Sequence, residues 1–273
     1  MTDSEIKAIE GWFSRIDMAL FRFFLSRPAP LCGAGDLAEL GVYLGKSAVL
    51  IGSYQQPGET FSVVDLFGMA SDDPGNAREN EDQYGGLSQG RFERNYRSVH
   101  ADLPVVIRGV SSAITTRAAH GTHRFVHVDA SHLYEQVRSD LQAARTLLRP
   151  QGIVAVDDIQ SQHTPGVAAA VWQEVAGGLS PLVISPFKLY GTWGSSTSWQ
   201  AAIGTWVDRN GWPHETQLVS GHELVRVWER PRVRDRWLPP AAVPKLRTAS
   251  RAVRRLGRAV TPAAGRRTAP HTR

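Results

Sequence analysis

The chain has 273 residues, of which 42% are hydrophobic, and a single cysteine, Cys32. This length supports one sizeable hydrophobic core, and the composition is typical of a globular protein. A lone cysteine excludes a disulfide framework within the chain and predicts a cytoplasmic location. The net charge of +5 is uneven, because residues 230–273 carry 12 Arg and one Lys against one Asp, which leaves −7 on residues 1–229.

Residues 1–30 are predicted to form an amphipathic helical extension. Charged residues such as Lys7, Glu10 and Arg15 interrupt the apolar residues of this segment, as in an amphipathic helix. The segment is too charged to be the apolar region of a secretory signal. We expect it to pack across the sheet of the main domain. Contact with a membrane surface or with a second copy of the chain is the alternative.

A glycine turn follows the first predicted strand. This strand starts at residue 36 and ends in Glu39, and Gly41 and Gly45 lead into a helix over residues 47–53. A second strand over residues 61–67 places Asp65 at its carboxyl end. In Rossmann-like folds a glycine turn and an acid in this order hold the ribose of a nucleotide. The glycines do not follow the GlyXGlyXXGly spacing, which argues against NAD.

The segment from Gly68 to Arg91 is polar and rich in glycine. Long loops in compact domains are usually functional or disordered. Because this loop follows the carboxyl end of a strand, we expect a lid over residues 68–91. Its acids lack the order of an EF-hand, so a solvated loop is favoured over a calcium site.

Acidic residues end two apolar runs that read as neighbouring buried strands. Residues 125–129 end in Asp129, residues 152–158 end in Asp157 and Asp158, and the residues between them have helical spacing. In such a β-α-β unit the carboxyl ends of both strands share one edge of the sheet. Carboxylates there suit Mg²⁺ or Ca²⁺, and His132 is placed for proton abstraction. The alternative is that these acids only cap helices or form turns.

The remaining pattern predicts an α/β fold: a Rossmann-like, doubly wound, mostly parallel sheet with helices on both faces. A helix over residues 165–175 precedes three strand-like runs, which would add an antiparallel edge; they span residues 181–193, 199–206 and 224–228. One domain is expected over residues 31–229. The basic tail, residues 230–273, is expected to be partly disordered. It could contact anionic lipid, but no motif indicates a nucleic-acid partner.

Four of these segments, in this order, resemble class I S-adenosylmethionine-dependent methyltransferases; they are residues 39–47, 63–68, 127–134 and 152–159. More narrowly, they resemble the metal-dependent O-methyltransferases that modify the sugars of macrolides and related natural products, and the cephalosporin-hydroxylase-like group. Residues 165–167 are similar to that family as well. The resemblance covers roughly residues 35–175 of the sequence.

The resemblance implies S-adenosylmethionine as the cofactor, a divalent cation such as Mg²⁺, and a role for each matching residue. The implied cofactor residues are Glu39, Gly41, Asp65 and Ser111, the implied metal ligands are Asp129, Asp157 and Asp158, and the implied general base is His132. Two features depart from the family. Asp157 stands where glutamate is common, and residues 108–112 lack the acid often found after the third strand.

These observations predict an enzyme that methylates a hydroxyl, with a sugar or another small molecule as the acceptor. A catechol-like phenol is the alternative acceptor. A protein that binds the cofactor without catalysis is the alternative from another functional class. Self-association remains open.

Overall fold

The computed structural model describes residues 1–26, 31, 33–69 and 87–230. Most of the predicted lid and all but the first residue of the basic tail lie outside the described residues. Among the residues that are described, no helix has the length and apolar composition needed to cross a membrane.

A nine-stranded sheet lies at the centre of the structure, in the order β3-β2-β1-β4-β5-β7-β6-β9-β8. The strands are β1 (Asp36–Leu40), β2 (Phe61–Asp65), β3 (Val105–Arg108), β4 (His123–Val128), β5 (Leu148–Val156), β6 (Ser180–Ile184), β7 (Leu189–Thr192), β8 (His214–Val219) and β9 (His222–Val227). Strands β1 to β5 pair in parallel, and β7 is antiparallel to both β5 and β6. The predicted Rossmann-like, mostly parallel sheet with an antiparallel edge is confirmed.

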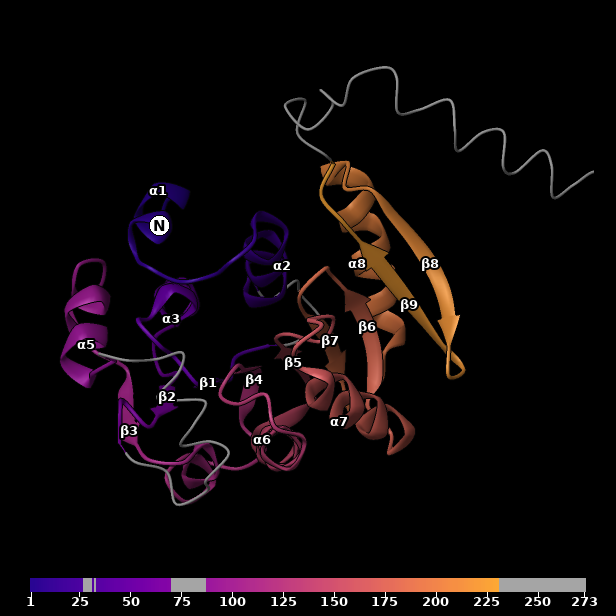
Figure 1. The fold of residues 1–273 in the computed structure, drawn as a ribbon. Coiled ribbons are helices and arrows are strands. Elements are labelled where there is room, and N and C mark those ends of the chain that lie inside the picture. The colour runs from indigo at the N-terminus through magenta and orange to yellow at the C-terminus, as the bar shows by residue number, and fades with distance from the viewer. Residues whose placement is uncertain (27–30, 32, 70–86, 231–273) are drawn as a thin grey trace, which may run out of the picture. The chain divides into compact units, whose positions relative to one another are not determined.

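Helices cover both faces of the sheet (Figure 1). They are α1 (Asp3–Ala8), α2 (Arg15–Leu25), α3 (Lys46–Gly52), α5 (Gln89–Arg97), α6 (Tyr134–Leu147), α7 (Pro165–Ala176) and α8 (Thr197–Asn210), with a short 3₁₀ helix, η1 (Ser111–Thr116). Successive strand residues point to opposite faces, so each central strand supplies two cores. Leu37 and Phe125 belong to the core that includes residues of α2, α3 and α8, whereas Ala38 and Val126 belong to the core that includes residues of α6 and α7.

The predicted β-α-β unit is present. Strands β4 and β5 are parallel neighbours, with His127 opposite Ala155 and Val128 opposite Val156. The residues that follow these strands therefore meet at one edge of the sheet. Strand β1 pairs with the other side of β4, so the glycine turn after β1 reaches the same edge.

The N-terminal extension contains two helices, where the sequence predicts one. Gly11 has a φ of +132°, and Ser14 caps α2 by accepting a hydrogen bond from the Asp17 N–H at 3.0 Å. The backbone therefore leaves the helical conformation between α1 and α2. Helix α2 packs on the sheet, and the Phe21 ring centroid lies 5.1 Å from that of Phe125.

The prediction of a strand over residues 199–206 is wrong, because these residues lie in α8. Trp199, Ile203 and Val207 are buried at four-residue spacing, which is typical of a helix. In the sequence this spacing is hard to recognise, because the run contains further apolar residues between these positions. The run at 181–193 forms two strands, β6 and β7, rather than one. Strand β8 was not predicted, since its residues are mostly exposed at the edge of the sheet.

Candidate active site

A pocket opens at the carboxyl ends of the parallel strands, the edge at which open α/β folds bind ligands. Its lining includes the turn after β1, the end of β2 and the segment that follows β3. Gly41, Asp65 and Ser111, three of the predicted cofactor residues, all line this pocket. The fourth, Glu39, is fully buried and is hydrogen-bonded to Ser47, which lines the pocket.

Asp65 organises the turn that forms the pocket wall. Its carboxylate accepts hydrogen bonds from the N–H groups of Val42, Tyr43 and Phe67 at 2.8, 3.1 and 2.7 Å. Burial raises the pKa of Asp65, and these three backbone donors oppose that shift. A carboxylate has about four acceptor positions, so Asp65 retains capacity for one ligand hydroxyl. This is what a ribose-binding acid requires.

Gly41 is required by the close approach of two strand ends. Its φ is +81°, and a Cβ at this position would lie 2.1 Å from the Asp129 carbonyl oxygen and 2.5 Å from the Ala130 Cα. Only glycine adopts this backbone conformation without strain and leaves this space open. The glycine turn therefore sets how closely the first pocket approaches Asp129.

Glu39 has an unsatisfied buried oxygen beneath the pocket. Its Oε1 accepts hydrogen bonds from the Ser47 hydroxyl and from the Nδ1–H of His127, the latter at 2.7 Å. Among the described residues, Oε2 has no hydrogen-bond partner, and burial raises the pKa of Glu39 to about 8. Buried polar groups are almost always satisfied, so the unpartnered Oε2 marks a polar position beneath the pocket that is left for a bound group.

Ser111 lies at the start of η1, where the resemblance implies contact with the adenine. Its hydroxyl donates to Asp140 of α6, a fully buried carboxyl group whose pKa burial raises to about 7. The donated proton fixes the direction of the Ser111 hydroxyl. The Ser111 oxygen therefore serves as an acceptor on its remaining side.

A second pocket adjoins the first. Its floor carries Asp129, Asp157 and Asp158, and aromatic side chains, including Trp12 and Phe187, stand around it. Asp129 and Trp12 line both pockets. The Asp129 side chain is 31% exposed. The two pockets thus meet at a partly exposed carboxylate.

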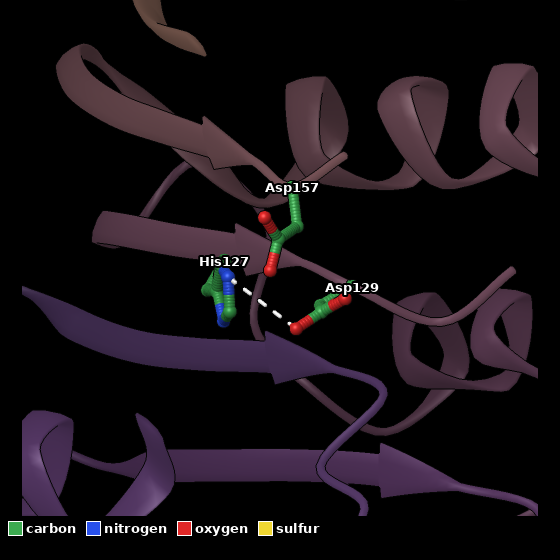
Figure 2. Close-up of side chains that lie close together, drawn as sticks. All are labelled: His127, Asp129 and Asp157. Carbon is green, nitrogen blue, oxygen red and sulfur yellow. Dashed lines mark ion pairs between the residues drawn. The ribbon is translucent and has the colours of Figure 1, made fainter. Parts of the chain in front are cut away.

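The three predicted metal ligands divide into two overlapping groups. His127, Asp129 and Asp157 offer ligand atoms within 4.8 Å of one another, and so do Asp129, His132 and Asp158. Figure 2 shows the first group converging at the ends of β4 and β5. Asp129 belongs to both groups. Its pKa is raised well above the usual range because the surrounding protein reduces its contact with water and because the Asp157 carboxylate is close, which is the electrostatic environment that a bound cation relieves.

An internal cation already occupies the first of these groups. The Lys188 ammonium donates to Asp157 Oδ2 and lies 3.2 Å from His127 Nε2. Because an ammonium only donates, His127 Nε2 accepts from Lys188, and Nδ1 carries the ring proton and donates a hydrogen bond to Glu39. Burial lowers the pKa of Lys188, but Asp157 and Asp129 raise it above its usual value. Lys188 therefore stays charged.

Sequence reasoning did not identify Lys188 or Trp12. The available signal for Lys188 was a lone lysine within the apolar run at 181–193, since a lysine is almost never fully buried without a partner. Trp12 was placed within a single N-terminal helix. The break at Gly11 takes it out of that helix and into both pocket linings.

His132 is paired with Asp158. Its Nε2 lies 2.8 Å from Asp158 Oδ2, and the Ser161 hydroxyl donates to the other oxygen of Asp158 at 2.6 Å. Burial raises the pKa of Asp158, but the hydrogen bonds from His132 and Ser161 lower it to about 2. An ionised Asp158 accepts from Nε2–H of His132 and would stabilise the ring in its protonated form, which suits a proton acceptor.

A hard divalent cation fits this site. Asp129 and Asp158 supply carboxylate oxygens of one group beside the second pocket, whereas Asp157 belongs to the other group and is paired with Lys188. Oxygen donors of this kind are those preferred by Mg²⁺. Asp158 adopts a φ of +57°, which aspartate tolerates better than most residues.

Comparison with known proteins agrees with this geometry. Residues 38–159 match the family described as a methyltransferase domain. No curated protein matches the sequence. The O-methyltransferase NovP is similar in structure, with 21% identity, a TM-score of 0.55, and coverage of 65% of this chain and 79% of NovP.

Two further solved structures are similar. A protein from Corynebacterium glutamicum has 12% identity and a TM-score of 0.51, with 71% of this chain and 91% of that chain covered. A TDP-rhamnose 3'-O-methyltransferase from calicheamicin biosynthesis has 20% identity and a TM-score of 0.43, with 67% and 82% covered. At these identities the likeness concerns the fold. Residues 38–159 thus match a methyltransferase domain, and the chain shares its fold with an O-methyltransferase of known structure.

Proposed function

We propose that this protein transfers the methyl group of S-adenosylmethionine to a hydroxyl group, with a sugar as the acceptor. A divalent cation, held by Asp129, Asp157 and Asp158, would orient that acceptor, and His132 would be the general base. The family match supports methyl transfer. The residues around the two pockets support the finer statements.

One observation carries the proposal: two adjoining pockets share Asp129 and Trp12. Methyl transfer needs the donor sulfur and the acceptor oxygen in line and close together. The first pocket has the acid at the end of β2 that suits a ribose hydroxyl, and the second has acids that suit a metal and a polar acceptor. Asp129 lies at the boundary, which is where the methyl group would have to pass.

The proposed reaction is a direct displacement. The acceptor oxygen attacks the methyl carbon of the sulfonium, the carbon–sulfur bond breaks, and S-adenosylhomocysteine leaves as a neutral thioether. The hydroxyl proton would pass to the His132 imidazole, and Asp158 would hold the resulting imidazolium through its 2.8 Å hydrogen bond. A divalent cation, when bound, supplies Lewis-acid stabilisation for the developing oxygen anion.

The acceptor class is inferred from the walls of the second pocket. Aromatic side chains pack well against the apolar faces of a sugar ring, and Trp12 and Phe187 are 80% and 48% exposed beside an acidic floor. A sugar presents hydroxyls to that floor and a carbon face to those rings. A catechol also has a flat face and two adjacent hydroxyls, and it remains the second candidate for the same reason.

Two measurements test the proposal. Calorimetry with S-adenosylmethionine and S-adenosylhomocysteine tests the cofactor: binding of both is expected, and binding of neither would exclude methyl transfer from this donor. Turnover is then compared across glycosides and catechols, with Mg²⁺ or with excess chelator. Full activity in chelator would show that the acids serve the structure rather than a metal.

A further inference from the structure

Lys188 is held at a fixed position beside the candidate metal ligands. It lies in the turn between β6 and β7, where its backbone N–H donates to the Ser185 hydroxyl at 2.8 Å. The residue is 2% exposed, and its ammonium lies 5.7 and 5.9 Å from the ring centroids of Phe13 and Phe21. The side chain is enclosed on these sides, so the ammonium has little freedom to leave the acids.

Acidic groups surround this ammonium from several elements. Asp157 follows β5 and forms the direct ion pair, Asp129 follows β4, and Asp17 belongs to α2. Asp17 is fully buried and accepts a hydrogen bond from the Tyr190 hydroxyl at 2.9 Å. Lys188 thus lies between the candidate metal ligands and α2.

We propose that Lys188 is a built-in cation that removes one unit of negative charge from the acids and thereby favours a divalent ion over a trivalent one. Asp129, Asp157 and Asp158 would together carry three negative charges. With Lys188 the sum falls to two, which one divalent ion neutralises. This proposal rests on the proposed metal site.

The physical reason is that Coulomb energy scales with the charge of the bound ion. At the same position, the repulsion energy between a fixed positive charge and a trivalent ion is about 1.5 times that for a divalent ion. Calcium-binding proteins likewise tune their affinity through the number of ligand charges. Removal of the ammonium should therefore change the ratio of the trivalent-ion affinity to the divalent-ion affinity, and not only the two affinities themselves.

The test compares Ca²⁺ with Tb³⁺, two oxygen-seeking ions of similar radius and different charge. Terbium luminescence gives the Tb³⁺ affinity directly, and displacement by Ca²⁺ gives the second value. The variants are Lys188→Met, which removes the buried charge, and Lys7→Met, which makes the same change at an exposed lysine of α1. A double variant, Lys188→Met with Asp157→Asn, removes one charge of each sign.

We expect Lys188→Met to shift the affinity ratio toward Tb³⁺ by at least tenfold, and Lys7→Met to leave it unchanged. The double variant should return the ratio toward that of the unmodified protein, since the acids again sum to two negative charges. It also removes the buried ion pair as a whole, which proteins tolerate better than the loss of one partner. If Lys188→Met does not fold, the affinity ratio can therefore still be measured in the double variant.

The outcomes separate this inference from the proposed function. Ion binding with an unchanged ratio in Lys188→Met overturns the role of Lys188 and leaves the metal site standing. Failure of every protein to bind either ion removes the metal site and the inference together. Binding by Lys188→Met alone would show that the ammonium takes the place of the ion, which overturns the selectivity role of Lys188 and removes the metal from the proposed function.

Discussion

Replacement of Gly41 by alanine is predicted to destabilise the protein and to displace Asp129. The new Cβ would lie 2.1 Å from the Asp129 carbonyl oxygen, so the two strand ends must separate by about 1.3 Å or more to restore ordinary contact. Two hydrogen bonds of 2.8 Å flank this point, from Asp129 N–H to Leu40 O and from Gly41 N–H to Val64 O. Their stretching costs about 1 kcal/mol each. Left-handed backbone adds about 1–2 kcal/mol for a residue with a Cβ, which gives an expected loss of about 3–4 kcal/mol.

Gly58 provides a matched control, because its φ is +83° and a Cβ there would meet nothing within 4 Å. Gly58→Ala should therefore show only the backbone cost, about 1–2 kcal/mol. Urea unfolding of both variants measures the difference in unfolding free energy. Calorimetry with S-adenosylhomocysteine should show weaker binding for Gly41→Ala alone. Equal losses of stability in the two variants would refute the close-approach argument.

Three further results are expected. Asp65→Asn should weaken S-adenosylhomocysteine binding by about 1–3 kcal/mol, measured by calorimetry, because it removes a charged hydrogen-bond acceptor. His132→Ala should lower kcat by roughly 10²–10⁴-fold with cofactor affinity retained, measured in steady-state assays. Folded Asp140 keeps its proton up to a pKa of about 7 instead of 3.8, so the unfolding free energy should fall as pH rises between these values; Asp140→Asn should remove that slope in urea titrations.

Each of these expectations has a contradicting outcome. Undiminished binding by Asp65→Asn would mean that this acid only supports the turn after β1. Near-normal kcat in His132→Ala would assign proton removal to another group. Parallel pH–stability curves for the wild type and Asp140→Asn would show that Asp140 titrates in the folded protein as it does in water.

The central part of the fold follows from the sequence because its strands are buried on both faces. Continuous apolar runs predict β4 and β5, and a parallel neighbour relation follows from the helix between them. The predicted site residues consequently lie at one sheet edge. Trp199, Ile203 and Val207 show the limit, since a tryptophan-rich apolar run has no period distinctive enough to separate a helix from a strand.

The contacts of Lys188 lie beyond local sequence reasoning. Its partners Asp157 and His127 are 31 and 61 residues away in the chain, and only the antiparallel return of β7 beside β5 brings them together. Trp12 is similar, because its place in both pocket linings depends on the backbone turn at Gly11. Local patterns specify strands and helices, whereas these two positions depend on how distant elements pack.

Transfer of a labelled methyl group tests the central claim most directly. The protein, Mg²⁺ and S-adenosylmethionine with a deuterated methyl group are incubated with a panel of glycosides and catechols, and the products are analysed by mass spectrometry. We predict that the label appears on a hydroxyl oxygen of a glycoside, and that Asp129→Ala abolishes this transfer while S-adenosylhomocysteine still binds. Label on a nitrogen or carbon atom, or undiminished transfer by Asp129→Ala, would contradict the proposed site.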